Sequence, residues 1–178
     1  METGSKQTKY ICQIAVISDV HDNWANLDKA IEMLKKSPDI SQLILCGDVC
    51  APITLKKIIE TLKNFDIYLV YGNVDGDHKS MEEIEKNYNN LKIYGLEGKI
   101  KICGRKIGFT HFKTRAKKMA EKDSFDIIFY GHTHSPWEEK IKETILLNPG
   151  ELTGFFGKST FVIYDLEMMQ AKLKICGG

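Results

Sequence analysis

The sequence lacks several features that mark whole classes of protein. No apolar run approaches the roughly 18 residues that a membrane-spanning helix needs, and residues 1–10 are polar, without the apolar centre of a secretory signal. There is no excess of one charge either, because 25 basic residues stand against 24 acidic ones. We therefore expect neither a membrane nor long nucleic acid as a partner, since either would favour a broad basic surface.

Cysteine is scarce and scattered. The five cysteines are odd in number, and most fall in apolar, strand-like runs: Cys12, Cys46, Cys50, Cys103 and Cys176. This usage is typical of reduced, buried thiols in a cytoplasmic protein and not of a disulfide framework. Cys46 and Cys50 flank Asp48, but their spacing matches no zinc knuckle, so we interpret them as small core residues.

Repeats, low-complexity segments and visible linkers are absent as well, and 178 residues suit a single domain. With 43% hydrophobic and 28% charged residues, the composition is typical of a globular chain rather than a disordered or fibrous one. We expect a flexible tail over residues 1–8 and one domain over residues 9–178.

The first half of the chain alternates between strand and helix patterns. Continuous apolar runs predict buried strands over residues 9–17, 42–46 and 66–71. Apolar residues at helical spacing follow each of them, which predicts a parallel sheet with right-handed crossovers.

The second half has shorter, glycine-punctuated runs, which predict hairpins. Strands are expected over residues 91–94, 99–103, 106–110, 125–130, 138–141, 145–148, 160–166 and 172–176, with a basic helix over residues 113–121. The element order favours an α/β fold in which two mixed sheets pack together with helices outside them.

Metal-binding types of side chain gather where the expected strands end. They are Asp19, His21, Asp48, Asn73, His111, His132 and His134. Ligands in open α/β sheets bind at the carboxyl ends of strands, so we expect these seven side chains at one edge. The remaining histidine, His78, is expected to be merely solvated.

These residue types select the metal. Two carboxylates, a carboxamide and four imidazoles form an oxygen and nitrogen shell that suits Mn²⁺, Fe²⁺, Co²⁺, Ni²⁺ or Zn²⁺ better than Ca²⁺ or Mg²⁺. Seven ligands exceed what one ion needs, whereas two ions that share a carboxylate would use them all.

The ordered blocks resemble a known family. Asp19-x-His21, Gly47-Asp48, Gly72-Asn73, His111 and Gly131-His132-x-His134 resemble the signature of the calcineurin-like metallophosphoesterases. Leu147-Asn148-Pro149-Gly150 resembles the Asn-Pro-Gly segment of the small prokaryotic phosphodiesterase branch, and the match covers residues 11 to about 150. The resemblance implies a four-layer αββα sandwich, in which two mixed β-sheets are flanked by helices.

The resemblance also implies a site for two divalent transition-metal ions, with Mn²⁺ as the first choice. The first ion would take Asp19, His21, Asp48 and His134, and the second would take Asp48, Asn73, His111 and His132. Asp48 would bridge the ions together with a hydroxide, and we expect Asp48, Asn73 and His111 to serve catalysis. The implied reaction is hydrolysis of small phosphodiesters or activated phosphate esters by that hydroxide.

Two positions depart from the family pattern. Val74 stands where the phosphomonoesterases usually carry a histidine that protonates the leaving group, which shifts the expected substrates toward diesters. Lys113 replaces the second imidazole of a His-Gly-His block. Lys113 begins the basic run that includes Arg115, Lys117 and Lys118, interpreted as a solvated helix face or, for its first members, as a contact to a substrate phosphate.

Alternatives accompany these hypotheses. Asp19 and Asp48 could be helix N-caps, and Asp75 is expected to orient its loop rather than bind metal. The rival function is a non-catalytic scaffold of the retromer-subunit type, which loses the residues that match His21 and Asn73 and would expose a large apolar patch. A homo-oligomer is compatible with the sequence.

Overall fold

The computed structural model describes residues 12–176, so the expected tail over residues 1–8 lies outside the described residues. The helices are α1 (Trp24–Lys35), α2 (Pro52–Thr61), α3 (His78–Asn87) and α4 (Lys113–Lys122). The strands are β1 (Gln13–Ile17), β2 (Ile40–Leu45), β3 (Asp66–Leu69), β4 (Leu91–Ile93), β5 (Glu97–Ile102), β6 (Arg105–Thr110), β7 (Ile127–Phe129), β8 (Trp137–Ile141), β9 (Thr144–Asn148), β10 (Thr160–Asp165) and β11 (Gln170–Ile175).

The first sheet has six strands in the order β11-β10-β1-β2-β3-β4. Strands β1 to β4 are parallel, and β10 and β11 add an antiparallel edge. The apolar run of β1 is buried on both faces because helices cover one side of the sheet and the second sheet covers the other. The predicted parallel sheet with helical crossovers is confirmed.

The second sheet has five strands in the order β5-β6-β7-β9-β8. Its central strands β6, β7 and β9 are parallel, while β5 and β8 pair antiparallel at the edges. The inner faces of the two sheets share a core that includes Val16, Ile44, Phe109, Phe129 and Tyr164. The carboxyl ends of β1, β2, β3, β6 and β7 carry the seven candidate ligands.

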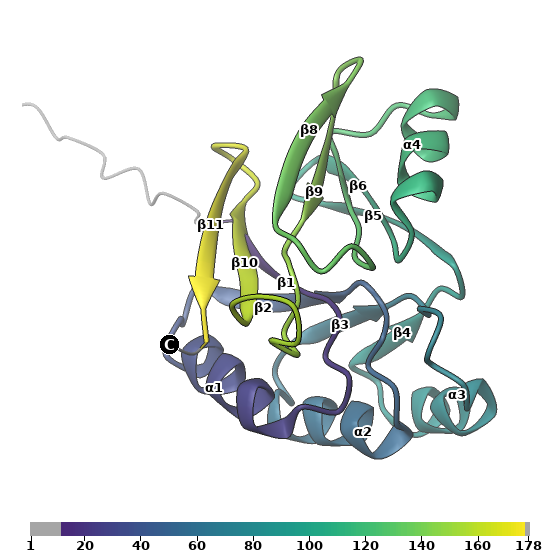
Figure 1. Ribbon diagram of the computed structural model, residues 1–178, viewed down its shortest axis with the longest axis vertical. Helices are drawn as coiled ribbons and strands as arrows, with labels where there is room; N and C mark the ends of the chain where they lie inside the picture. Colours follow the sequence, from purple (N-terminus) through teal and green to yellow (C-terminus); the bar gives the residue numbers. More distant parts are fainter. Residues whose placement is uncertain (1–11, 177–178) are drawn as a thin grey trace, which may run out of the picture.

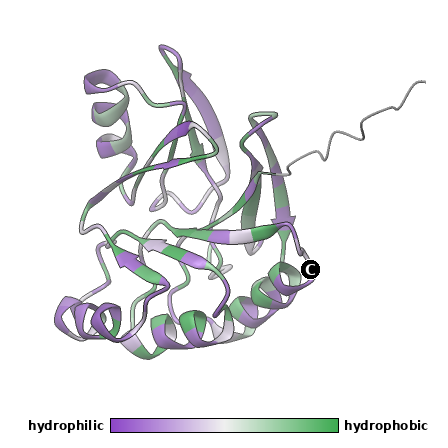
Figure 2. Cartoon of the chain, turned by 180° about the vertical axis from the view of Figure 1, so that it is seen from behind, coloured by the Kyte–Doolittle hydropathy of each residue, from purple (hydrophilic) through white to green (hydrophobic). Residues whose placement is uncertain are grey.

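Helices complete the four layers (Figure 1). Helices α1, α2 and α3 lie along the outer face of the first sheet, and α4 packs on the outer face of the second. Each helix buries one apolar face, as α1 does with Leu27, Ala30, Ile31 and Leu34. Figure 2 shows hydrophobic residues along the strands and hydrophilic residues on the outer sides of the helices. The expected αββα sandwich is confirmed.

One strand pairs differently from the prediction. Residues 91–94 were expected in a hairpin, but β4 instead joins the first sheet parallel to β3, with Ile67 opposite Leu91. The reason is that α3 returns the chain across the sheet before β4 begins. The next two strands, β5 and β6, form the expected hairpin.

The expectation that the cysteines form no disulfide is wrong for one pair. Cys12, just before β1, is bonded to Cys103 in the β5–β6 turn, with 6.5 Å between their Cα atoms. Cys12 and Cys103 meet because the inner faces of the two sheets pack together beside Cys12 and Ile102. Cys46, Cys50 and Cys176 are free thiols, as the sequence predicts.

Within residues 12–176, none of the four helices has the length and apolarity that crossing a bilayer requires.

We predict that Gly98→Ala destabilises the packing between the sheets. Gly98 lies opposite the buried Phe109 across the β5–β6 pair, and a Cβ at this position would overlap the phenyl ring. Overpacking of this kind costs about 1–3 kcal/mol in the free energy of unfolding. Urea denaturation checks the value, with Gly76→Ala as the matched control because a Cβ there meets no other atom. Equal stability of the two variants would contradict the packing.

Candidate metal centre

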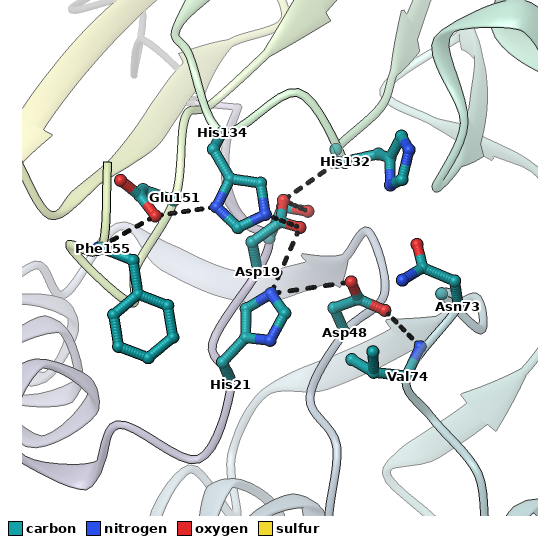
Figure 3. A network of polar contacts seen from close by, with 12 residues as sticks. Asp19, His21, Asp48, Asn73, Val74, His132, His134, Glu151 and Phe155 are labelled. Atoms are coloured by element: carbon teal, nitrogen blue, oxygen red, sulfur yellow. Dashed lines mark hydrogen bonds and ion pairs between the residues drawn. The ribbon is translucent and has the colours of Figure 1, made fainter. Parts of the chain in front are cut away.

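The structure brings the seven predicted ligands together where strands of both sheets end, and Figure 3 labels all of them except His111. Asp19, His21 and His134 offer ligand atoms that all lie within 4.8 Å of one another, and Asp48, His111 and His132 do the same. We name these groups the first and the second cluster. Asn73 joins the second cluster, because its Oδ1 lies 3.0 Å from His111 Nε2.

Asp48 lies between the two clusters. Its Oδ2 is 3.3 Å from Nε2 of His111 in the second cluster and 3.6 Å from Nε2 of His21 in the first. His21 Nε2 also lies 3.8 Å from Asp19 Oδ1. One carboxylate oxygen of Asp48 therefore faces an imidazole from each side.

Protein donors hold the other oxygen of each aspartate. Asp19 Oδ2 accepts hydrogen bonds from Ser18 Oγ at 2.6 Å and from the backbone N–H of His132 at 3.0 Å. Asp48 Oδ1 accepts from the backbone N–H of Val74 at 3.0 Å. Each buried carboxylate is thus fixed by one oxygen and presents the other to the imidazoles.

Hydrogen bonds also fix the tautomers of two histidines. His111 Nδ1 lies 2.8 Å from the carbonyl oxygen of Cys46, and His134 Nδ1 lies 2.7 Å from Oε2 of Glu151. A carbonyl and an ionised carboxylate only accept, so Nδ1 carries the proton in both rings. In the neutral ring, Nε2 then presents a lone pair toward an aspartate oxygen.

Two of these atoms find no hydrogen-bond partner among residues 12–176. They are the buried Asp19 Oδ1 and His21 Nε2, and His134 Nε2 lies 3.3 Å from that same Asp19 oxygen. Facing lone pairs repel unless a cation stands between them, and unpaired buried polar atoms are costly. The residues present therefore fit divalent metal ions, which imidazole and carboxylate ligands bind together.

The same crowding shifts the pKa of three groups. Pairing with Asp19 raises the pKa of His21, although burial opposes the rise. Burial lowers the pKa of His111, but pairing with Asp48 outweighs it and the net pKa lies above the usual range. Burial raises the pKa of Asp48, yet the His111 pairing and the Val74 N–H bring the net pKa below its usual range.

The backbone at the site is strained. Five of the seven predicted ligands have a positive φ between 45° and 68°: Asp19, His21, Asp48, His132 and His134. The left-handed region costs a non-glycine residue about 1–2 kcal/mol. Glycines allow the close approach, because a Cβ on Gly72 would overlap Asp48 and one on Gly131 would overlap Ser18. Strain of this kind concentrates at functional sites.

Asp75 orients its loop, as the sequence analysis expects. Its buried carboxylate accepts from the backbone N–H groups of Asp48, Cys50 and Gly72 at 2.7–2.8 Å. The N-cap alternative for Asp19 and Asp48 is wrong, because α1 is capped by Asn23 and α2 begins after Ala51. Asp75 thus ties the loop after β3 to the loop after β2.

His78 and the basic run that begins at Lys113 both contact neighbouring side chains. His78 is exposed but not merely solvated, since its ring stacks on Tyr71 with 3.8 Å between centroids. Lys113 pairs with Glu139 at 3.1 Å, and Arg115 pairs with Glu97 at 2.8 Å. These ion pairs favour the interpretation of the basic run as a solvated helix face.

Sequence reasoning missed Glu151. Its fully buried carboxylate orients His134 and also accepts from the backbone N–H groups of Phe155, Phe156 and Gly157. Outer partners of this kind fix the ring orientation of metal-binding histidines. The one available signal was its position directly after Asn148-Pro149-Gly150.

Comparison with known proteins agrees with the geometry. The calcineurin-like phosphoesterase superfamily domain matches residues 12–169. A phosphodiesterase of Methanocaldococcus jannaschii is 33% identical over 158 residues, which cover 87% of this chain and 93% of that protein. A solved structure of an archaeal phosphodiesterase has a TM-score of 0.82 at 30% identity and covers 92% of this chain and 99% of its own.

A protein-sorting protein is also similar, at lower identity. Vacuolar protein sorting-associated protein 29 of Saccharomyces cerevisiae is 25% identical over 168 residues, which are 86% of this chain and 59% of the yeast protein. The two archaeal phosphodiesterases are higher in identity and in the share of their own length that is covered. The chain therefore belongs to the calcineurin-like phosphoesterase superfamily, and it is a metal-dependent hydrolase of phosphoesters.

Proposed function

We propose that this chain is a phosphodiesterase that holds two divalent transition-metal ions, with Mn²⁺ the first choice and Ni²⁺, Fe²⁺, Co²⁺ or Zn²⁺ as alternatives. The observation that carries the proposal is the position of Asp48 Oδ2, which faces His21 of the first cluster and His111 of the second. A carboxylate oxygen between two groups of metal-binding side chains is suited to bridge two ions.

The ligand sets follow from the two clusters. Asp19, His21 and His134 would hold the first ion with Asp48, and Asn73, His111 and His132 would hold the second with Asp48. Glu151 would orient His134, and the Cys46 carbonyl would orient His111, so that each ring points Nε2 inward. Hydrogen bonds within the protein thus orient these two rings, which lowers the cost of ordering the site for a metal ion.

Two ions held there would polarise the phosphoryl oxygens and lower the pKa of a shared water molecule. The side chains shape the access of the substrate. His132 and Asn73 are exposed at the rim, whereas Asp19, Asp48 and His111 are buried beneath it. A phosphoryl group would therefore enter over His132 and Asn73, where the Asn73 amide can donate to one of its oxygens.

Val74 supports diesters as the preferred substrates. Its side chain is 41% exposed, and its backbone N–H donates to Asp48, so it lies beside the site with no proton to give. A positioned general acid contributes about 10²–10⁴-fold to such reactions, and alkyl monoesters need one most. Substrates whose leaving group departs unaided should therefore react best. The M. jannaschii relative, named as a phosphodiesterase, agrees with this preference.

The scaffold alternative has less support. His21 and Asn73, the two residues that argue against it in the sequence, both face the clusters. The relative named for vacuolar protein sorting keeps this alternative testable. The expected cytoplasmic location remains a prediction.

We predict that Asp48→Asn abolishes most of the activity. The change keeps the size of the side chain but removes the charge that would bind both ions. Loss of an outer partner alone costs about 10- to 100-fold, so loss of this ligand charge should exceed that range. The assay is hydrolysis of bis(p-nitrophenyl) phosphate by metal-stripped protein refilled with Mn²⁺, compared with p-nitrophenyl phosphate.

The matched control is Asp28→Asn, since Asp28 is an exposed aspartate on α1 that pairs only with Lys57 among the described residues. This variant should retain wild-type turnover. Near-wild-type turnover in Asp48→Asn would exclude Asp48 as the bridge. No diester hydrolysis by the wild type with any of the five metals would favour the scaffold alternative.

We predict that Mn²⁺ binding weakens as the pH falls from about 8 to about 6. The raised pKa values of His21 and His111 mean that both rings take up protons above the usual value near 6.5. Their protonated pairs stabilise the metal-free fold fully below about pH 6.5, and this contribution is lost as the pH rises through the raised values. A metal ion must displace those protons.

Calorimetric titration of Mn²⁺ into the metal-stripped protein measures this competition. The affinity should rise about tenfold per pH unit for each displaced proton, and buffers with different heats of ionisation should report proton release. The same affinity at both ends of the range, without proton release, would show that these imidazoles do not ligate.

A further inference from the structure

The loop between β9 and β10 exposes two adjacent aromatic rings. Phe155 is 70% exposed and Phe156 is 81% exposed, which makes them the most exposed large apolar side chains among residues 12–176. Single exposed apolar residues are ordinary, but two consecutive exposed phenylalanines beside a polar site are typical of a surface that binds a ligand.

Both rings border the first cluster. The Phe155 ring lies 6.1 Å from the ring of His21, and the Phe156 ring lies 5.0 Å from the ring of His134 in an edge-to-face arrangement. Figure 3 shows Phe155 beside Glu151 and His21. A group attached to a phosphate at the clusters would therefore meet these rings where it extends past the first cluster.

Hydrogen bonds to the buried Glu151 hold the backbone of this loop. The fully buried Glu151 accepts from the backbone N–H groups of Phe155 at 3.2 Å and of Phe156 and Gly157 at 2.7 Å each. The same carboxylate binds His134 Nδ1. One buried group thus fixes both a predicted metal ligand and the backbone that carries the two rings.

Helix α1 anchors the start of the loop. Asn23 Nδ2 donates to the Thr153 carbonyl at 2.8 Å, and Asn26 Nδ2 donates to the Leu152 carbonyl at 3.1 Å. A pre-ordered apolar surface binds with a smaller entropy cost than a mobile one. The exposure of the rings therefore reflects a fixed surface and not a frayed loop.

We propose that Phe155 and Phe156 form an aromatic subsite that binds a planar ring esterified to the substrate phosphate. The inference rests on the proposed function, since it places the phosphoryl group at the clusters. Phenyl faces and edges attract other planar rings more than they attract a small alkyl group of the same ester. The chemistry is shared by an aryl ester and by a nucleobase, and both are tested below.

The test uses Mn²⁺-loaded protein and two ligand pairs that differ only in their aromatic group. Phenylphosphonate is compared with methylphosphonate, and adenosine 5′-monophosphate with ribose 5-phosphate, by calorimetric titration. The chains compared are the wild type, the double variant Phe155→Ala/Phe156→Ala, and Met168→Ala. Met168 is an exposed apolar residue in the β10–β11 turn, outside the site.

The aromatic member of at least one pair should bind the wild type about 3- to 10-fold more tightly, and that pair identifies the source of the ring. The double variant should lose this preference while its affinity for the non-aromatic ligands stays within about twofold. Met168→Ala should behave as the wild type does.

Three results would overturn the subsite. Equal affinities within both pairs in the wild type would show that the rings bind no aromatic group, and so would a preference that survives the double substitution. A wild-type dimer that dissociates in the double variant, seen by light scattering without any change in ligand preference, would assign the rings to self-association. If none of the four ligands binds, the proposed function fails and the subsite with it.

Discussion

The candidate metal centre depends on an electrostatic conflict between imidazoles and carboxylates. Asp19 Oδ1 and Asp48 Oδ2 face the Nε2 atoms of His21, His111 and His134, while the outer oxygen of each carboxylate is held by protein donors. Such a set is stable only with cations between its members, either protons on the rings or bound metal ions. The pKa values of His21 and His111 are raised because a proton on each ring can serve as the cation that the neighbouring aspartate needs.

The core between the two sheets holds the imidazoles and carboxylates in this unfavourable arrangement. Strained backbone at five predicted ligands and unpaired buried atoms both reduce stability, so they persist only where the surroundings hold them. The surroundings are strands whose last residues are buried, and loops tied together by Asp75 and Glu151. Glu151 also extends this order to Phe155 and Phe156, which links metal binding to the surface where a substrate would lie.

Much of the fold and of the site could be predicted from sequence. Apolar runs followed by helical spacing identify the parallel strands, and the sharp change to Asp, His or Asn at their ends identifies the site, because parallel strands end at one edge. Those signals are local. Pairing between distant segments is not a local signal. The sequence therefore predicts a hairpin for residues 91–94, whereas α3 returns the chain so that β4 pairs with β3.

Two further features of the structure also depend on contacts between distant segments and are therefore not predicted from the sequence. The Cys12–Cys103 bond joins residues 91 positions apart, and no spacing rule reports that the two sheets meet there. Glu151 looks like an ordinary acidic residue in sequence, and only its burial beside His134 reveals its role. For Lys113, two residues after His111, the sequence leaves a phosphate contact open beside a solvated helix face, and the structure pairs its ammonium group with Glu139 on β8.

Anomalous diffraction at the manganese edge from Mn²⁺-soaked crystals would show whether Asp48 bridges two metal ions. We predict two anomalous peaks about 3.5–4 Å apart, one among Asp19, His21 and His134 and one among Asn73, His111 and His132, both in contact with Asp48. A single peak, or two peaks that share no ligand, would contradict the account.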